Sequence, residues 1–393
     1  MPKLINLNSF KEFFQSGSTG GIILIACVFI SILIANTSAA HLFENFLSQN
    51  IGFHTESIHL RYPVLLWIND GLMAIFFLLV GLEIKRELVE GELSSFKKAS
   101  LPILAAIGGV IAPALIYFAL NNGTKTAAGW GIPMATDIAF AIAVITMLGK
   151  KVPASLKIFL AALAIVDDLM AILVIAVFYS NDIHFANLAY AGAIFLFLLV
   201  LNKAGVKSLE AYLIPGLFIW YFIHHSGVHA TIAGVLTAFA IPTTPDAKES
   251  PLEKLEHILV NPVNFIIMPL FALANTNITF EPAMIDGLTT TLGLGIMFGL
   301  VLGKPLGIVC FSWLAVKLGI GKMPHKANWK HIIGLGLLGG IGFTMSVFIA
   351  LLSFPGELLI LSEAKFSILT GSVLSGILGY FWLASLHKKK SLA

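Results

Sequence analysis

The stretch from Ile158 to Phe178 places the strongest constraint on how this chain folds. Its 21 residues are all apolar except for the adjacent pair Asp167 and Asp168. Because a helix crosses the hydrocarbon core of a bilayer with about 20 residues, the stretch predicts a membrane-spanning helix with two carboxyl groups near its middle. A charged side chain at that depth costs about 3 kcal/mol or more and usually marks an ion or proton pathway. We therefore expect the pair to handle an ion or a proton; a structural pair tied to a neighbouring helix is the alternative.

The composition places the chain among helical membrane proteins with many spans. It has 393 residues, of which 58% are hydrophobic and 11% are charged, whereas soluble proteins carry about 25% charged residues. We expect an all-α fold that forms a single integral-membrane domain over residues 1–393. The sequence has no basic patch interleaved with aromatic residues, so a nucleic-acid partner is not expected. Cys27 and Cys310 lie in apolar runs and predict no metal site, and we expect no cofactor.

Hydropathy predicts about twelve membrane spans. They lie near residues 17–36, 63–84, 99–120, 125–147, 154–178, 186–202, 209–223, 226–241, 256–275, 290–315, 331–353 and 361–385. Threading these spans through a bilayer puts 20 of the 24 Lys and Arg residues on one side, three on the other and Lys304 inside a span. Because basic residues concentrate in cytoplasmic loops, both termini are expected in the cytoplasm. Short alternating patches around Asn50 and Gly52 in the segment 46–60 predict a small β-hairpin on the outer surface, with an irregular loop as the alternative.

The fourth span, which reads GWGIPMATDIAFAIAV, contains residues that interrupt a helix. Pro133 cannot donate a backbone hydrogen bond, and Gly129 and Gly131 weaken the helix before it. A break there leaves unpaired N–H groups at the start of the second half, where they favour a nearby anion. Asp137, four residues after the proline, is the expected anion. An ordinary proline kink, with Thr136 bonding back to its own helix, is the alternative.

The eleventh span, which reads GLGLLGGIGFTMSVF, holds five glycines within nine residues. Close helix packing on small residues is one explanation, and a second broken helix that crosses the first is the other. Two interrupted spans at corresponding positions of two halves indicate a transporter site. The fourth span belongs to a triplet of spans 3–5, the eleventh to a triplet of spans 10–12, and the triplets run in opposite directions. We therefore predict an inverted repeat with two broken, crossing helices.

Lys304 is the only Lys or Arg deep within a predicted span, and Pro305 follows it directly. A buried ammonium without a partner loses its proton or disrupts the span. Asp167 and Asp168 supply the expected partner, although the negative end of a half-helix would also serve. Neighbours on a helix diverge by about 100°, so one aspartate can bind a cation while the other pairs with Lys304. A lysine that reaches the membrane surface is the alternative.

Charged residues also gather at the cytoplasmic ends of two spans. On the second span Glu83, Arg86 and Glu87 have the spacing of one helix face, and Glu256 and His257 begin the ninth span. A solvated helix end explains such clusters. The alternative is an acidic funnel that attracts cations, with a histidine that titrates near neutral pH.

With these residues in hand, the chain closely resembles the NhaA-type sodium/proton antiporters over nearly its whole length. The motifs that carry the resemblance are long and lie in both halves of the sequence. They are WINDGLMAIFFLLVGLEIKRE at 67–87, GWGIPMATDIAFAIAV at 129–144, LAIVDDLMAI at 163–172, HSGVHATIAGV at 225–235, LEH at 255–257 and VLGKPLGI at 301–308.

The resemblance implies an antiporter, not an enzyme, that exchanges cytoplasmic Na⁺ or Li⁺ for external H⁺ across the bacterial inner membrane. Asp168 is then the main ligand of the transient Na⁺, Asp167 its essential partner and Thr136 a supporting oxygen. Asp137 and Lys304 are similar to the charges that offset the ends of the half-helices where the two broken spans cross. The substrates would be Na⁺, Li⁺ and H⁺, and the protein would lie in the lipid bilayer.

The resemblance also implies regulation by pH, for sodium and pH homeostasis. The matching cytoplasmic residues are Glu83, Arg86, Glu87, Glu256 and His257. Asp70, near the outer end of the second span, and His229, in the HSGVHATIAGV motif, are further candidates. Relatives form homodimers partly through an outer hairpin, here 46–60. The chain departs from relatives at Val260, where they can carry a second histidine. A basic residue is also expected in the segment before LEH, and here Glu253 stands close by. Both changes bear on the pH midpoint rather than on transport.

Three other classes of function are alternatives to sodium/proton exchange for a chain with buried charged residues. A proton-coupled carrier of a small organic solute would also use buried carboxylates, but it would not respond to Na⁺. A cation channel would need a filter-like motif, which the sequence lacks. An intramembrane enzyme would need a catalytic set, and the HH pair at 224–225 lacks the HExxH spacing of a zinc protease.

Overall fold

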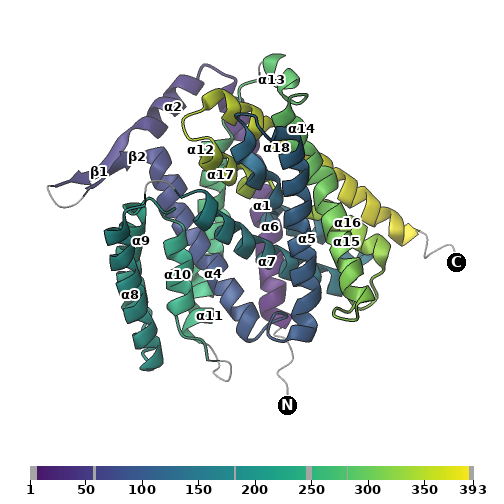
Figure 1. Ribbon diagram of the computed structural model, residues 1–393, viewed down its shortest axis with the longest axis horizontal. Helices are drawn as coiled ribbons and strands as arrows, with labels where there is room; N and C mark the ends of the chain where they lie inside the picture. The colour runs from purple at the N-terminus through teal and green to yellow at the C-terminus, as the bar shows by residue number, and fades with distance from the viewer. Residues whose placement is uncertain (1–6, 56–58, 181–182, 245–249, 281, 389–393) are drawn as a thin grey trace. The chain divides into compact units, whose positions relative to one another are not determined.

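The computed structural model describes residues 7–55, 59–180, 183–244, 250–280 and 282–388. Within these residues nearly all regular structure is helical, and the one sheet is a short β-hairpin (Figure 1). The predicted all-α, polytopic fold is confirmed. Four basic residues that enter the predicted charge asymmetry, Lys3, Lys248, Lys389 and Lys390, lie outside the described residues.

Most helices correspond to the predicted spans. In chain order these are α1 (Leu7–Ala35), α4 (Met73–Val89), α5 (Phe96–Asn121), η2 with α6 (Ala127–Met134 and Ile138–Met147), α7 (Ala154–Phe178), α8 (Phe185–Lys203), α9 (Glu210–His224), α10 (Ile232–Ala240), α11 with η4 and α12 (Pro251–Pro262, Val263–Ile267 and Met268–Thr276), α14 with η5 and α15 (Thr291–Phe298, Gly299–Gly303 and Lys304–Lys317), α16 with α17 (Trp329–Gly339 and Phe343–Ser353) and α18 (Leu358–Lys388). The remaining elements are α2 (Ala40–Ser48), β1 (Asn50–His54), β2 (His59–Pro63), α3 (Val64–Leu66), the π turn η1 (Trp67–Leu72), η3 (Gly149–Lys151) and α13 (Pro282–Gly287).

Eight helical segments of the described chain are long and apolar enough to cross a bilayer, and two bent helix pairs raise the number to ten. The short helices α9 and α10, with 15 and 9 residues, complete a set of about twelve. The predicted span 226–241 is too long, because α10 begins only at Ile232. Turns precede it, and Gly227 has a φ of 81°, a left-handed conformation that does not continue a helix.

The chain divides into two compact units. Unit 1 comprises Met1–Ile22, Glu87–Val174 and Phe280–Ala393, and unit 2 comprises Ile23–Arg86 and Ile175–Thr279. Apart from the last turn of α7, the predicted triplets of spans 3–5 and 10–12 both lie in unit 1. The two members of the predicted repeat therefore belong to the same compact unit.

In unit 1, α5 and α15 touch through their backbones. A Cβ atom at Gly108 would collide with the Gly307 carbonyl oxygen, and one at Gly307 would collide with that of Gly108. Small residues at such positions allow helices in membranes to approach closely. Lys304 precedes Gly307 by about one turn, so this contact holds the lysine beside α5, where its Cδ lies 3.7 Å from the Cβ position of Gly109.

In unit 2, residues of α4, α8, α9, α10 and α11 share an apolar core that includes Leu82, Ile219 and Ile223. A Cβ atom at Gly234 would collide with the carbonyl oxygen of Ala74, so α4 and α10 also touch through their backbones. This contact fixes the positions of α4 and α10 within the unit.

The predicted β-hairpin exists and extends past the predicted segment 46–60 to Pro63, with Asn50 and Gly52 in its first strand. Both belong to β1, which pairs antiparallel with β2 so that Asn50 lies opposite Pro63. The φ of Gly52 is 111°, so glycine is needed here for an irregularity within a strand and not for a turn. Residues 56–58 lie outside the described residues.

Candidate functional site

The first broken span brings Asp137 to the start of a helix. η2 is a 3₁₀ helix with Pro133 near its end, residues 135–137 are not helical, and α6 follows directly. Oδ1 of Asp137 accepts a hydrogen bond from the backbone N–H of Phe140 at 3.1 Å. The buried carboxylate therefore caps α6, where the helix dipole favours a negative charge.

The second broken span presents its own helix start to the same aspartate. α16 and α17 differ in direction by 47° across residues 340–342. Oδ2 of Asp137 accepts hydrogen bonds from Thr344 N, at 3.0 Å, and from Thr344 Oγ1. The N–H of Asp137 donates to the carbonyl of Ile341 at 2.6 Å. One carboxylate thus serves the first turns of both α6 and α17.

The two breaks also exchange side-chain hydrogen bonds. Thr136 Oγ1 has one hydrogen to donate, which is shared between the Gly339 carbonyl at 2.8 Å, where α16 ends, and Oδ2 of Asp167. In the opposite direction, Ser346 Oγ of α17 donates to the Ile132 carbonyl of η2 at 2.7 Å. Each broken helix therefore satisfies a backbone group of the other, as an apolar environment requires. The predicted pair of broken, crossing helices is confirmed, and Thr136 does not bond back to its own helix.

Asp167 joins three spans at this crossing. Its Oδ2 accepts a hydrogen bond from Thr136 Oγ1 at 2.6 Å and forms an ion pair with Lys304 Nζ. All three side chains are fully buried, so Lys304 does not reach the membrane surface. Within the described residues, Oδ1 of Asp167 has no hydrogen-bond partner. One carboxylate oxygen is thus saturated by two donors, and the other is open to a cation or a further donor.

Asp168 follows Asp167 on α7 and is also buried. Asp168 is therefore a second buried carboxyl group beside the one that pairs with Lys304. Two carboxylates and a threonine hydroxyl are oxygen donors of the kind that small hard cations prefer. Among the described residues no group of three or more His, Cys, Asp or Glu side chains suits a resident metal ion. The oxygen donors at the crossing are therefore of the kind that a small hard cation can bind.

Lys304 is held at an irregular point of its helix. It directly follows the π turn η5 inside the continuous span Thr291–Lys317, and Pro305 comes next. Such π turns occur frequently at functional sites. The irregular turn and the contact with α5 together aim the ammonium group at Asp167.

The five residues predicted to respond to pH fall in both units. In unit 2, Arg86 Nη1 pairs with Glu256 Oε1 at 2.8 Å, Glu83 is buried and His257 is exposed. In unit 1, Glu87 Oε2 accepts a hydrogen bond at 2.9 Å from a backbone N–H five residues later. The ion pair of Arg86 and Glu256 therefore links α4 to α11 within unit 2.

Asp70 and His229 come together in unit 2, with an additional histidine. Asp70 Oδ2 lies 3.2 Å from His224 Nδ1, and Asp70 Oδ1 lies 3.9 Å from His229 Nε2. The indole N–H of Trp220 donates to the Asp70 carbonyl at 3.2 Å. The sequence signal for His224 is the HH pair at 224–225, which by itself does not indicate a partner for Asp70.

Thr344 and Ser346 are members of the crossing that sequence reasoning missed. Both lie in the GFTMSVF part of the eleventh span, directly after its cluster of glycines. The available signal was their position, because hydroxyl residues follow the second break much as Thr136 stands at the first. Their hydrogen-bond partners lie more than 200 positions away along the chain.

Comparisons with known proteins place the chain in one family over almost its whole length. The profile of the family described as Na⁺/H⁺ antiporter 1 matches residues 11–383. The protein "Na(+)/H(+) antiporter NhaA 2" of Flavobacterium johnsoniae is 63% identical over 391 residues, which cover 99% of this chain and 96% of that protein. The NhaA antiporter of Flavobacterium psychrophilum is 53% identical over 374 residues, 95% of each chain. That of Escherichia coli O139:H28 is 47% identical over 380 residues, which cover 96% of this chain and 98% of the relative.

Proposed function

The chain belongs to the Na⁺/H⁺ antiporter 1 family and exchanges Na⁺ and H⁺ across the membrane, and we propose that Asp167 and Asp168 form the site of this exchange. The observation that carries the proposal is the fully buried ion pair of Asp167 with Lys304, placed where the two broken helices cross. Buried charges in a membrane are rare and mark ion pathways. The bacterial inner membrane protein is then a transporter whose substrates are Na⁺ or Li⁺ and H⁺, without enzymatic activity.

Competition for the same oxygens explains the exchange. A carboxylate that holds a proton presents less negative charge to Na⁺, so the site binds either protons or the cation. If the site opens to one side of the membrane at a time, this competition alone yields antiport. External protons load the site, the site turns inward, and a cytoplasmic Na⁺ or Li⁺ displaces the protons and is exported.

Asp167 and Asp168 take different parts in this cycle. Asp168 is the main cation ligand, whereas Asp167 alternates between Lys304 and the cation. Because Thr136 and Lys304 already donate to Oδ2 of Asp167, a cation that needs this oxygen must displace the ammonium group. The lysine and the aspartates then titrate as a coupled set, and an exchange of more than one proton per Na⁺ moves net charge.

Asp137 has a supporting part. Its two oxygens accept hydrogen bonds from Phe140 and Thr344, so they are occupied by the two helix starts. The carboxylate offsets the positive ends of both half-helices while Asp167 and Asp168 change partners. It therefore keeps the crossing in place without binding the transported ion.

The cytoplasmic residues adjust exchange to pH, in support of sodium and pH homeostasis. The Arg86–Glu256 ion pair is the contact that supports this assignment, since neutralising one partner changes the attraction between α4 and α11. We expect Glu256→Gln to shift the pH at which exchange is half-maximal while leaving the maximal rate within about twofold, since most of the pair is lost but the ion site is not touched. An unchanged pH profile in vesicles would remove Glu256 from the regulatory set.

The whole chain acts as one transport domain over residues 1–393, with both termini in the cytoplasm and a homodimer as the working form. The excess of Lys and Arg in one set of loops supports the orientation, and the exposed β-hairpin supplies a surface for self-association. Labelling of single cysteines near each terminus by a membrane-impermeant reagent tests the orientation. Chemical cross-linking in intact membranes tests the dimer.

Inverted membrane vesicles test the central assignment. A proton gradient is established by respiration, and its collapse on addition of Na⁺ or Li⁺ reports exchange. Asp168→Asn is expected to abolish the response because the amide neither binds the cation as strongly nor takes up the proton. Full activity in this variant contradicts the proposal. If the proton gradient in vesicles with the wild-type protein does not respond to Na⁺ but collapses when a small organic solute is added, the protein is a proton-coupled carrier instead.

A further inference from the structure

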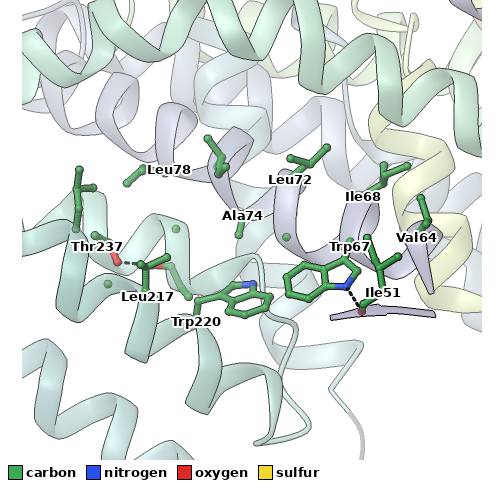
Figure 2. Close-up of a pocket in the computed structure, with 16 residues that line it drawn as sticks. Ile51, Val64, Trp67, Ile68, Leu72, Ala74, Leu78, Leu217, Trp220 and Thr237 are labelled. Atoms are coloured by element: carbon green, nitrogen blue, oxygen red, sulfur yellow. Dashed lines mark hydrogen bonds between the residues drawn. The ribbon is translucent and has the colours of Figure 1, made fainter. Parts of the chain in front are cut away.

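Unit 2 contains an elongated apolar pocket that has no part in the ion chemistry described above. Its volume is about 560 Å³, and Figure 2 shows its lining spread in a row from Leu78 and Thr237 at one end to Val64 and Ile51 at the other. The polar groups in the lining are already satisfied. The Trp67 indole N–H donates to the Ile51 carbonyl at 3.2 Å, and the Thr237 hydroxyl donates to a carbonyl of its own helix at 2.8 Å.

The pocket runs along two helical segments rather than across them. Between Val64 and Leu78 the lining residues recur every three or four positions, and between Leu213 and Trp220 on α9 they do the same. This spacing places each set on one helix face. With a rise of 1.5 Å per residue, the stretch from Val64 to Leu78 is about 21 Å long. A long and narrow ligand matches this shape better than a compact one.

The depth of the pocket corresponds to one leaflet of the bilayer. The membrane span runs from Val64 to Val89, so Val64 stands at its end and Leu78 near its middle. Half of a hydrocarbon core is about 15 Å thick. The stretch from Val64 to Leu78, at about 21 Å, is therefore long enough to cross one leaflet completely. Near the Ile51 end the rings of Trp67 and Trp220 are stacked, with centroids 5.9 Å apart, and tryptophan is enriched at the membrane–water boundary.

The pocket is continuous with a surface that faces lipid. Leu217 in its lining is 68% exposed and Ile51 is 49% exposed. On α9 the neighbouring side chains of Ile214 and Phe218 are also exposed and apolar. In a multi-pass membrane protein such a surface contacts lipid chains, so the pocket opens onto the interface with the bilayer.

We propose that this pocket binds one acyl chain of a phospholipid from the leaflet next to the β-hairpin, with the headgroup at the hairpin end. An acyl chain is apolar, flexible and aligned with the helices, and it demands no hydrogen bond from the lining. Once bound, it contacts the Val64–Leu78 segment and α9 at the same time and fills the space between them. The inference requires only that the protein spans a membrane, so it stands apart from the assignment of the ion site.

Quenching of tryptophan fluorescence by brominated phosphatidylcholine tests this proposal, because a bromine atom quenches only at close contact. The chain has six tryptophans, so the test uses a variant in which Trp130, Trp313, Trp329 and Trp382 are replaced by Phe. Only Trp67 and Trp220 then report. We expect quenching in detergent solution to saturate at about one lipid per chain and to be strongest with bromine near the glycerol end of the acyl chain. Unbrominated phosphatidylcholine should reverse it.

Two glycine substitutions supply the matched comparison. A side chain at Gly71 enters the pocket, where its Cβ would meet only the Trp67 ring, at 3.3 Å, whereas a Cβ at Gly192 on α8 has nothing within 4 Å. In the two-tryptophan background, Gly71→Leu should reduce the saturable quenching at least threefold and Gly192→Leu should leave it unchanged. Quenching that rises without saturation and is equal in all variants reflects ordinary bilayer contact and overturns the proposal. Absence of quenching, as when a second copy of the chain covers the pocket, overturns it as well.

Discussion

Each unit of this molecule holds an aspartate beside basic side chains, and the two differ in burial. In unit 1, Asp167 and Lys304 are completely enclosed. In unit 2, the side chains of Asp70 and His224 are 15% and 13% exposed. Moving a charge out of water costs several kcal/mol per ion, so each member of the enclosed pair depends on the other, whereas the partly exposed pair keeps some solvation. This difference in burial supports the proposal that Na⁺ and protons exchange at Asp167 and Lys304, where water cannot replace a lost partner.

Removal of the lysine from the enclosed pair should have the largest effect. Lys304→Ala leaves the Asp167 carboxylate buried without its counter-charge, which costs about 3–5 kcal/mol in other proteins. We expect a marked fall in the thermal unfolding temperature in detergent and a loss of Na⁺-driven exchange in vesicles. The double variant Asp167→Asn with Lys304→Gln removes both charges of the pair and should regain most of the stability but none of the exchange. A Lys304→Ala protein as stable as the wild type would contradict the account of the enclosed pair.

Loss of the threonine hydroxyl at the crossing should have an intermediate effect. Thr136→Val removes the one hydroxyl hydrogen that Asp167 Oδ2 and the Gly339 carbonyl share, a contribution of about 1 kcal/mol or somewhat more beside a charge. We expect the Na⁺ concentration for half-maximal exchange to rise by roughly tenfold, with a small loss of stability. Thr136→Ser keeps the hydroxyl and serves as the control. Equal behaviour of the Val and Ser variants would show that the hydroxyl has no part in cation binding.

Neutralisation of the partly exposed pair should have the smallest effect. Ion pairs near solvent contribute about 1 kcal/mol or less. The Trp220 indole N–H donates to the backbone carbonyl of Asp70, so this hydrogen bond remains when the side chain is changed. We therefore expect Asp70→Asn to keep its unfolding temperature close to that of the wild type and its exchange rate within about twofold. A loss as large as that of Lys304→Ala would remove burial as the explanation for the difference between the units.

The sequence alone predicted the parts of the fold that single residues determine. Pro133 and its neighbouring glycines predicted the break in the fourth span. The charges of Lys304 and of the Asp167–Asp168 pair, all within apolar spans, predicted that the lysine pairs with an aspartate. The glycines of the eleventh span forecast the second break. These inferences succeed because a proline or a buried charge has few acceptable environments in a bilayer.

The features that escaped prediction depend on partners far away in the sequence. The bonds from Thr344 to Asp137 and from Ser346 to Ile132 join residues more than 200 positions apart, and no local pattern encodes them. The pairing of β1 with β2 could not be read from the sequence, because the alternating pattern around Asn50 and Gly52 does not say which residues lie opposite each other. The length of the span around α10 was overestimated because hydropathy does not detect the turn at Gly227, which precedes the helix.

The central claim is that Na⁺ and protons compete for the carboxylates at the crossing. Proton release on Na⁺ binding to the purified protein in detergent tests it most directly, by calorimetry in buffers of different ionisation enthalpy. The account predicts that the wild type releases protons as it binds Na⁺ and that Asp168→Asn, folded with a near-normal unfolding temperature, neither binds Na⁺ nor releases protons. Sodium binding by the wild type without proton release, or undiminished proton release in Asp168→Asn, would contradict it.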